Sequence, residues 1–294
     1  MHEICNMESL FPLLTKLDCA GKRLDLSKPV VMGILNIAPD SFYDGGRFGT
    51  LDARLKQTEQ MLKEGASIID LGAVSTRPGA LEVSPDIELE RLLPSLQSIR
   101  NHFPECILSV DTYRPLIARA VVDHGADMIN DIYGGRFEEG MLATISNLKV
   151  PYILMHLKGD PEKMQDNPAY SDVVAEVAYF LEQQTIQCRA KGIHQIIIDP
   201  GFGFGKTIQH NFQLLSRLET FRSLGFPLMV GISRKSLIHR FLEITPDTAL
   251  NGTTVLHTIA LLKGANILRV HDVKEAMEAI RLVGMLDEQE LLSL

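Results

Sequence analysis

Four residues that could hydrogen-bond to a ligand come at or near the ends of short apolar runs: Asn36, Asp111, Asn130 and Asp199. An ionised carboxylate can accept two parallel hydrogen bonds, so two aspartates beside an amide suit the edge of a flat heterocycle that offers adjacent N–H donors. A general acid and base pair, of the kind that cleaves glycosidic bonds, is the competing interpretation of the two carboxylates. The amide and the nearby Lys235 favour recognition of a heterocycle.

Basic side chains occur at similar positions. Arg269 and His271 are two residues apart at the end of an apolar run, so they face the same way if the run is a strand. Lys235 follows another apolar run, and Arg77 lies in the loop after the apolar run at 67–71. At an effective dielectric constant near 20, a cation ~4 Å from an anionic charge contributes roughly 4 kcal/mol before desolvation. We expect these residues to form a site for an anion such as a phosphate.

Two loops could also contribute to this anion site. The segment DPGFGFGKT (199–207) has three glycines and resembles a phosphate-binding loop, but it lacks the spacing GxxxxGK[ST] of a Walker A motif. The segment STRPGA (75–80) offers two hydroxyls, an arginine and a Pro-Gly turn. Each loop alone is also compatible with a simple turn, so its interpretation as part of a site depends on the neighbouring strand ends.

The elements that must position these residues repeat one pattern, in which a short apolar run is followed by a polar loop and an amphipathic stretch. The runs are rich in Ile, Val and Leu with little polar alternation, which is typical of parallel strands buried on both faces. The expected strands are residues 30–37, 67–71, 106–111, 127–132, 151–156, 195–199, 227–233 and 266–270. The expected helices are residues 52–65, 86–102, 114–124, 138–148, 172–191, 211–224, 248–263 and 273–286.

This alternation predicts an α/β fold, an eight-stranded parallel β/α (TIM) barrel with a short N-terminal extension. A doubly wound open sheet is the alternative, but it usually has fewer strands in one domain. In a barrel the active site lies at the carboxyl ends of the strands, where the polar residues occur. We predict an extension over residues 1–25, whose only role we can suggest is a cap on the bottom of the barrel, and one barrel domain over residues 26–294.

The composition of the chain argues against several classes of protein. The chain of 294 residues has a net charge of −8 and a pI near 5.6, which argues against a nucleic-acid or anionic-membrane surface. No apolar run approaches the ~20 residues of a membrane span, and the N-terminus does not resemble a signal peptide. The four cysteines are widely spread, which favours buried thiols over disulfides or a zinc site. We expect a soluble, cytoplasmic protein.

The ordered motifs resemble one family. They are GILNIAPDSFYDGG, STRPGA, SVDT, NDI, YILMH with MQDNPAYSDVV, IIIDPGFGFGK, GISRKS and RVHDV, and together they span residues 30 to 275. The same motifs occur in this order in dihydropteroate synthases. The resemblance implies a β/α barrel that joins 6-hydroxymethyl-7,8-dihydropterin pyrophosphate to 4-aminobenzoate, releasing pyrophosphate, with sulfonamides as inhibitors that mimic the aminobenzoate.

The resemblance also implies roles for individual residues and a Mg²⁺ cofactor. For the pterin it implies Asp111, Asn130, Asp199 and Lys235. For the pyrophosphate it implies Asn36, Arg77, Arg269 and His271, and for Mg²⁺ it implies Asn36 and Asp44. For the aminobenzoate and the loop over the site it implies Thr76, Arg77, Pro78, Phe204 and Ser236. The residues it implies for catalysis are Asn36, Lys235, Arg269 and His271.

The sequence departs from the common family pattern at Ala38, Val74 and Leu157, of which Val74 replaces a glutamate. Two other functions compete: a methyltransferase that uses methyltetrahydrofolate, and a non-catalytic pterin-binding barrel. The motifs GISRKS and RVHDV argue against the methyltransferase because it needs no pyrophosphate site. The intact charged motif residues argue against the non-catalytic barrel. Because dimers are common in the family, we expect a homodimer.

Overall fold

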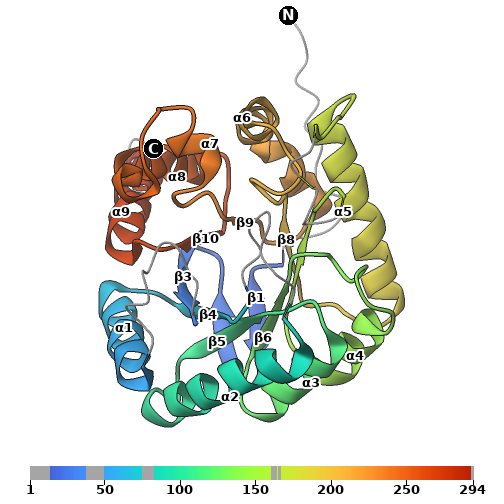
Figure 1. Cartoon of the computed structure of the whole chain (residues 1–294). Coiled ribbons are helices and arrows are strands. Elements are labelled where there is room, and N and C mark those ends of the chain that lie inside the picture. Colours follow the sequence, from blue (N-terminus) through green and yellow to red (C-terminus); the bar gives the residue numbers. More distant parts are fainter. Residues whose placement is uncertain (1–13, 38–49, 75–82, 160–163, 165–166, 293–294) are drawn as a thin grey trace, which may run out of the picture.

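The computed structural model describes residues 14–37, 50–74, 83–159, 164 and 167–292, with side chains as far as residue 286. Eight parallel strands with helices between them form a barrel, as predicted (Figure 1). The barrel strands are β3 (Val30–Asn36), β4 (Ile68–Gly72), β5 (Ile107–Asp111), β6 (Met128–Asp131), β7 (Tyr152–Met155), β8 (Ile196–Asp199), β9 (Met229–Val230) and β10 (Ile267–Val270). Seven of them lie inside a run that was predicted to be a strand, and β4 extends one residue beyond its predicted run of 67–71, to Gly72.

The sheet closes into a ring. Its order is β8-β7-β6-β5-β4-β3-β10-β9, and an isolated parallel bridge between Ile198 and Leu228 joins the two ends. Closure brings the carboxyl ends of all eight strands to one rim. Residues far apart in the sequence, such as those of β4 and β10, can therefore meet inside the barrel.

Helices surround the ring. They are α1 (Leu51–Glu64), α2 (Pro85–His102), α3 (Pro115–Asp123), α4 (Met141–Leu148), α5 (Val173–Ala190), α6 (Ile208–Ser216), α7 (Ser236–His239), α8 (Leu250–Leu262) and α9 (Val273–Leu292), with 3₁₀ turns η1 (Leu218–Leu224) and η2 (Pro246–Thr248). Local chemistry sets their ends: Asp172 caps α5 by accepting hydrogen bonds from two backbone N–H groups, and Gly65 ends α1 in the left-handed conformation.

One helix prediction needs correction. The stretch 211–224 is not one helix: α6 ends at Ser216, and the 3₁₀ turn η1 continues from Leu218. Leu218 and Phe221 in η1 are buried. The apolar side chains that predicted a single helix are still buried. The chain breaks after Ser216, and α6 and η1 each bury their own apolar residues.

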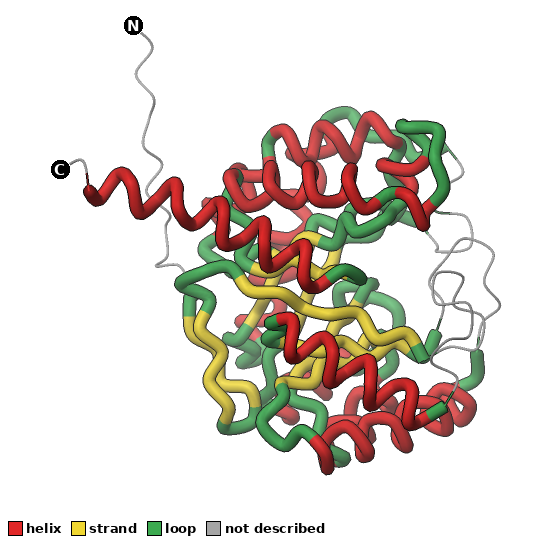
Figure 2. Tube along the Cα trace, turned by 90° about the vertical axis from the view of Figure 1, so that its left-hand side faces the viewer, coloured by secondary structure: helices red, strands yellow, loops and turns green. Residues whose placement is uncertain are grey.

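The segment 16–25 is an antiparallel hairpin of β1 (Lys16–Cys19) and β2 (Lys22–Asp25). Leu17, Cys19 and Leu24 of the hairpin belong to one buried cluster with the first inward-facing residues of the barrel strands. Figure 2 shows the hairpin below and to one side of the ring. The hairpin covers the amino ends of the strands, the place suggested for the N-terminal extension.

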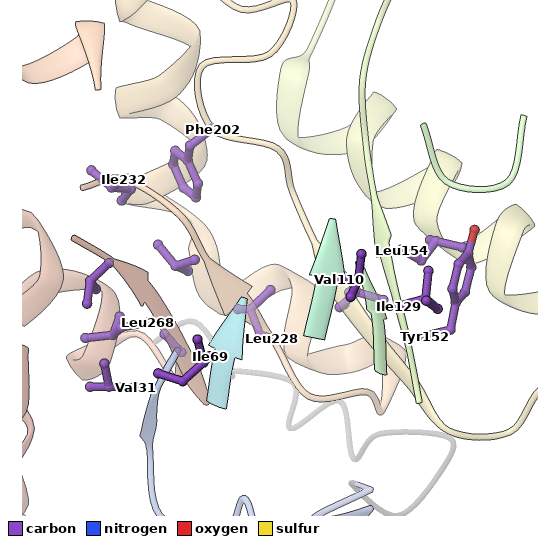
Figure 3. Packing of buried hydrophobic residues seen from close by; sticks show 14 of the residues in the cluster. Val31, Ile69, Val110, Ile129, Tyr152, Leu154, Phe202, Leu228, Ile232 and Leu268 are labelled. Atoms are coloured by element: carbon purple, nitrogen blue, oxygen red, sulfur yellow. The ribbon is translucent and has the colours of Figure 1, made fainter. Parts of the chain in front are cut away.

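The outer surface of the ring is mostly apolar, with Asp131 of β6 as a buried exception that accepts a hydrogen bond from the Tyr152 hydroxyl. Side chains that alternate outward from the strands, such as Val31, Ile69, Val110, Ile129 and Leu268, pack beneath the helices (Figure 3). This layer explains why the strands read as mostly apolar runs. It also holds the strands rigidly enough to fix what their inward side chains face.

The interior changes from apolar to polar in one step. The lowest inward layer is Met32, Ile68, Ile107, Met128, Ile153, Ile197, Met229 and Ile267. Two residues further along each strand, where the side chain faces inward again, the residues are Ile34, Asp70, Ser109, Asn130, Met155, Asp199, Gly231 and Arg269. Charged groups therefore lie on an apolar floor, away from the open solvent.

Candidate active site

Arg269 is the centre of the polar layer. Its Nε donates a hydrogen bond to Oδ2 of Asp70 (2.7 Å), and its Nη2 donates to Oδ2 of Asp111 (3.3 Å). Burial alone would lower the pKa of the guanidinium, but the two carboxylates outweigh it and raise the pKa. Arg269 is therefore a fixed cation at the base of the pocket.

Asp70 is fully buried, and one of its carboxylate oxygens accepts hydrogen bonds from two neighbouring side chains. The same Oδ2 that accepts from Arg269 also accepts from Nδ2 of Asn130 (3.1 Å). Its other oxygen, Oδ1, has no hydrogen-bond partner among the residues that the structure describes. The contacts link β4, β6 and β10 across the interior of the barrel.

Asp111 and Asp199 are held in different ways. Burial raises the pKa of Asp111 to about 7, although Arg269 acts to lower it. Burial also raises the pKa of Asp199, with Lys235 and a hydrogen bond from the Gly201 N–H opposing it. That N–H donates to Oδ1 of Asp199 at 2.7 Å, which leaves Oδ2 for another donor. Both carboxyl groups face the interior, as the sequence predicted.

Lys235 lies just before the short helix α7 and reaches back over the loop after β8. Its Nζ donates to the backbone oxygen of Phe202 (2.6 Å) and sits 4.5 Å from the ring centroid of Phe204. Burial lowers the pKa of Lys235 to about 8, against the attraction of Asp199. The amine is therefore mostly protonated at neutral pH. Ser236 follows it as the half-buried first residue of α7, so Phe204, Lys235 and Ser236 lie together.

His271 is not a cation in this environment. Its Nδ1 lies 3.1 Å from Oγ of Ser233, and its backbone N–H donates to the same oxygen at 3.2 Å. Burial, and after it the charge of Arg269, lowers the pKa of His271 to about 3. When the Ser233 hydroxyl donates to Nδ1, the proton of the neutral ring is on Nε2. The ring then offers an uncharged hydrogen-bond donor.

Asn36 ends β3 beside Asp111. Gly72 separates the two side chains: a Cβ built on Gly72 would lie 3.7 Å from Oδ1 of Asn36 and 3.8 Å from Cβ of Asp111. No group of three or more His, Cys, Asp or Glu residues within the described ranges could hold a metal ion. An amide oxygen beside a carboxylate nevertheless fits Mg²⁺, which binds through one or two protein oxygens together with substrate phosphates and water.

Four predicted site residues cannot be placed. Asp44, Thr76, Arg77 and Pro78 lie outside the residues that the structure describes. Val74, where the family commonly has glutamate, is half-buried and is the last described residue before them. The other predicted residues occupy the rim and the upper interior of the barrel.

Sequence reasoning missed Asp70 and left open the role of the glycine-rich loop. Asp70 is one residue before the end of its apolar run, and only its spacing of two from Ile68 indicated an inward position. In the loop, Lys206 is buried and its Nζ donates to the backbone oxygens of Gly201 (2.9 Å) and Phe204 (3.0 Å). The loop therefore uses its lysine to hold itself together rather than to bind a phosphate.

Sequence similarity to known proteins identifies the family of this chain. The profile of the family described as "Pterin binding enzyme" matches residues 32–271. The dihydropteroate synthase of Escherichia coli K12 is 46% identical over 270 residues, covering 91% of this chain and 95% of the relative. The chain belongs to the dihydropteroate synthase family.

Solved structures of dihydropteroate synthases have the same fold as this chain. The Yersinia pestis dihydropteroate synthase in a sulfonamide drug complex superposes with a TM-score of 0.90 at 41% identity, covering 93% of this chain and 99% of the other. The Xanthomonas albilineans enzyme with 4-aminobenzoic acid gives 0.86 at 40% identity, covering 93% and 98%. The chain is thus a transferase of folate synthesis that condenses 6-hydroxymethyl-7,8-dihydropterin pyrophosphate with 4-aminobenzoate to give 7,8-dihydropteroate and pyrophosphate.

Proposed function

We propose that the acceptors of the polar layer inside the barrel bind the pterin and that Arg269 of this layer, with Asn36 and His271 at the rim, binds the pyrophosphate. The rim also binds the aminobenzoate. The observation that carries this assignment is the set of inward donors and acceptors above an apolar floor. Asp111, Asp199 and Asn130 offer acceptors for the N–H edge of the pterin, and Lys235 offers a cationic donor for its oxygen. An apolar floor suits the flat face of a heterocycle.

Arg269, His271 and Asn36 surround the place of the leaving pyrophosphate. Arg269 supplies positive charge, His271 a neutral N–H donor and Asn36 an amide. Arg77 would add a second cation. Asn36, together with Asp44, would hold Mg²⁺, which when bound neutralises charge on the pyrophosphate oxygens.

The chemistry follows from these positions. The C–O bond between the pterin methylene and the pyrophosphate breaks, and Arg269 and His271 stabilise the charge that develops on the departing oxygen. The carboxylates of Asp111 and Asp199 favour the cationic character of the pterin. The arylamine then forms the new C–N bond and loses one proton. Phe204 and Ser236 would bind the aminobenzoate near Lys235, with Thr76 and Pro78 closing over the site, and sulfonamides would compete there.

The test separates binding from leaving-group departure. Asp199→Ala is expected to raise the Kd of the pterin pyrophosphate more than tenfold, since it removes a buried acceptor. Arg269→Ala is expected mainly to slow pyrophosphate release in single turnover. Release is measured with purified enzyme and Mg²⁺, with and without 4-aminobenzoate. If both variants turn over at the wild-type rate, the site assignment is wrong.

We further propose a homodimer and a cytoplasmic location. Exposed apolar side chains gather on α8 and α9, among them Leu262 (59% exposed) and Leu282 (72% exposed). A groove of about 680 Å³ between the two helices continues this surface and includes Leu282 and Leu286. A second copy of the chain would cover it.

The cytoplasmic location is supported by the free, buried thiols of Cys19, Cys106 and Cys188. Within the described ranges, no helix is long and apolar enough to cross a membrane.

A further inference from the structure

Asp70 does not belong to the set of ligand-binding residues above, yet two members of that set depend on it. It lies on β4 at an inward position, with 0% of its surface exposed. Its Oδ2 accepts from Nε of Arg269 at 2.7 Å and from Nδ2 of Asn130 at 3.1 Å. Neither partner is close to it in sequence, so neither contact serves local folding.

The contact with Asn130 fixes which way its amide faces. An ionised carboxylate only accepts hydrogen bonds, so it must be approached by the NH₂ end of the amide. The other end, the carbonyl oxygen Oδ1, is then the atom that Asn130 presents elsewhere. If the amide were reversed, a donor would take the place of that acceptor. Asp70 thereby determines the polarity of one contact that a bound heterocycle meets.

The contact with Arg269 fixes a side chain with several rotatable bonds. Nε is the guanidinium nitrogen nearest the backbone, and binding it to Asp70 defines the plane of the group. Nη2 then reaches Asp111. The remaining N–H groups of the guanidinium are held in one orientation, so the side chain loses less conformational entropy when an anion binds.

We infer that Asp70 is a positioning residue: by setting the amide orientation of Asn130 it determines affinity for the pterin substrate, and by setting the guanidinium plane of Arg269 it assists departure of the pyrophosphate rather than pterin binding. The inference rests on the proposed assignment of Asn130 to the pterin. It predicts a role for Asp70 that reaches the substrate only through its two partners.

The decisive measurement is a double-mutant cycle on the KM for pterin pyrophosphate. Asp70→Asn keeps the volume but lets an NH₂ group face Asn130, and we expect KM to rise about tenfold, with a larger rise for Asp70→Ala. The KM for 4-aminobenzoate should stay within about twofold of wild type. In the Asn130→Ala background, Asp70→Asn should change the pterin KM less than about threefold.

A matched control separates positioning from stability. Asp127 is also buried and pairs with two cations, Lys22 (2.6 Å) and Arg100 (2.5 Å), but it lies at the amino end of β6. Asp127→Asn should lower Tm and leave both KM values unchanged. KM does not depend on the fraction of active enzyme, so partial misfolding of an Asp70 variant does not obscure the result.

Two outcomes overturn the inference: wild-type pterin KM in both Asp70 variants, or a full effect of Asp70→Asn in the Asn130→Ala background. The second outcome would mean that Asp70 acts without Asn130. A failure of the proposed function looks different, because Asn130→Ala alone would then leave the affinity for the pterin unchanged.

Discussion

The amino nitrogen of Lys206 lies 3.0 Å from Nδ1 of His156, and both side chains are buried. Burial, followed by the charge of Lys206, lowers the pKa of His156 to about 2, so the ring is neutral and accepts the hydrogen bond at Nδ1. Burial also lowers the pKa of Lys206 well below its usual value. The pair ties the loop after β8 to the end of β7, and this loop carries Phe204 beneath Lys235.

We therefore expect Lys206→Met to destabilise the enzyme. The change keeps the length of the side chain but leaves buried backbone oxygens without a donor, at a cost of about 3 kcal/mol. Lys263→Met is the control, because Lys263 makes only a surface ion pair with Glu219 and should cost about 1 kcal/mol or less. Urea unfolding measures both. Equal costs for the two variants would show that the buried contacts of Lys206 do not stabilise the loop.

Gly201 lets the same loop pass close to the strand beside it. It has φ of +71°, and a Cβ built on it would lie 1.9 Å from the backbone oxygen of His156. Gly201→Ala should cost more than about 3 kcal/mol and reduce turnover, because the clash adds to the backbone strain. Gly140→Ala isolates the strain: φ is +94° with nothing within 4 Å, and about 1 kcal/mol is expected. If the two alanine variants unfold at the same urea concentration, the close approach at Gly201 is not what restricts it to glycine.

The pH dependence of kcat/KM for pterin pyrophosphate should be a narrow bell. Asp111 accepts hydrogen bonds only when ionised, so kcat/KM rises as pH increases through its pKa of about 7. Lys235 donates as a cation only when protonated, so kcat/KM falls as pH increases through its pKa of about 8. Lys235→Arg keeps the charge at high pH and should remove the alkaline fall while leaving the acid limb. An unchanged alkaline limb in that variant would assign the fall to another group.

Much of this fold was predictable because buried parallel strands leave a simple record in sequence. Every barrel strand coincides, to within one residue, with a mostly apolar run, since the outward layer under the helices is mostly apolar and the lower inward layer is apolar. The hairpin β1–β2 was missed because its strands mix charged with apolar residues and so leave no apolar run. Only tertiary packing against the bottom of the barrel makes Leu17 and Leu24 a core.

The candidate site was predictable in its residue types but not in its pairings. Spacing alone put Arg269 and His271 on one face. The partner of Arg269 could not be found this way, because Asp70 lies 199 residues away and meets it only after the barrel closes. The state of His271 also depends on three-dimensional surroundings: burial makes it neutral, although its sequence neighbours suggested a cation site.

The apolar surface on α8 and α9 should hold two copies of the chain together. Leu282 is 72% exposed on α9, whose C-terminal part extends beyond the barrel (Figure 2). Leu282→Glu would bury a charge in the proposed interface, so sedimentation velocity should show a monomer in place of the wild-type dimer. Tyr179→Glu is the matched control: Tyr179 is 65% exposed on α5, across the barrel from α9 (Figure 1), and its variant should remain a dimer. A wild-type monomer, or a Leu282→Glu variant that still sediments as a dimer, would place the interface elsewhere or remove it.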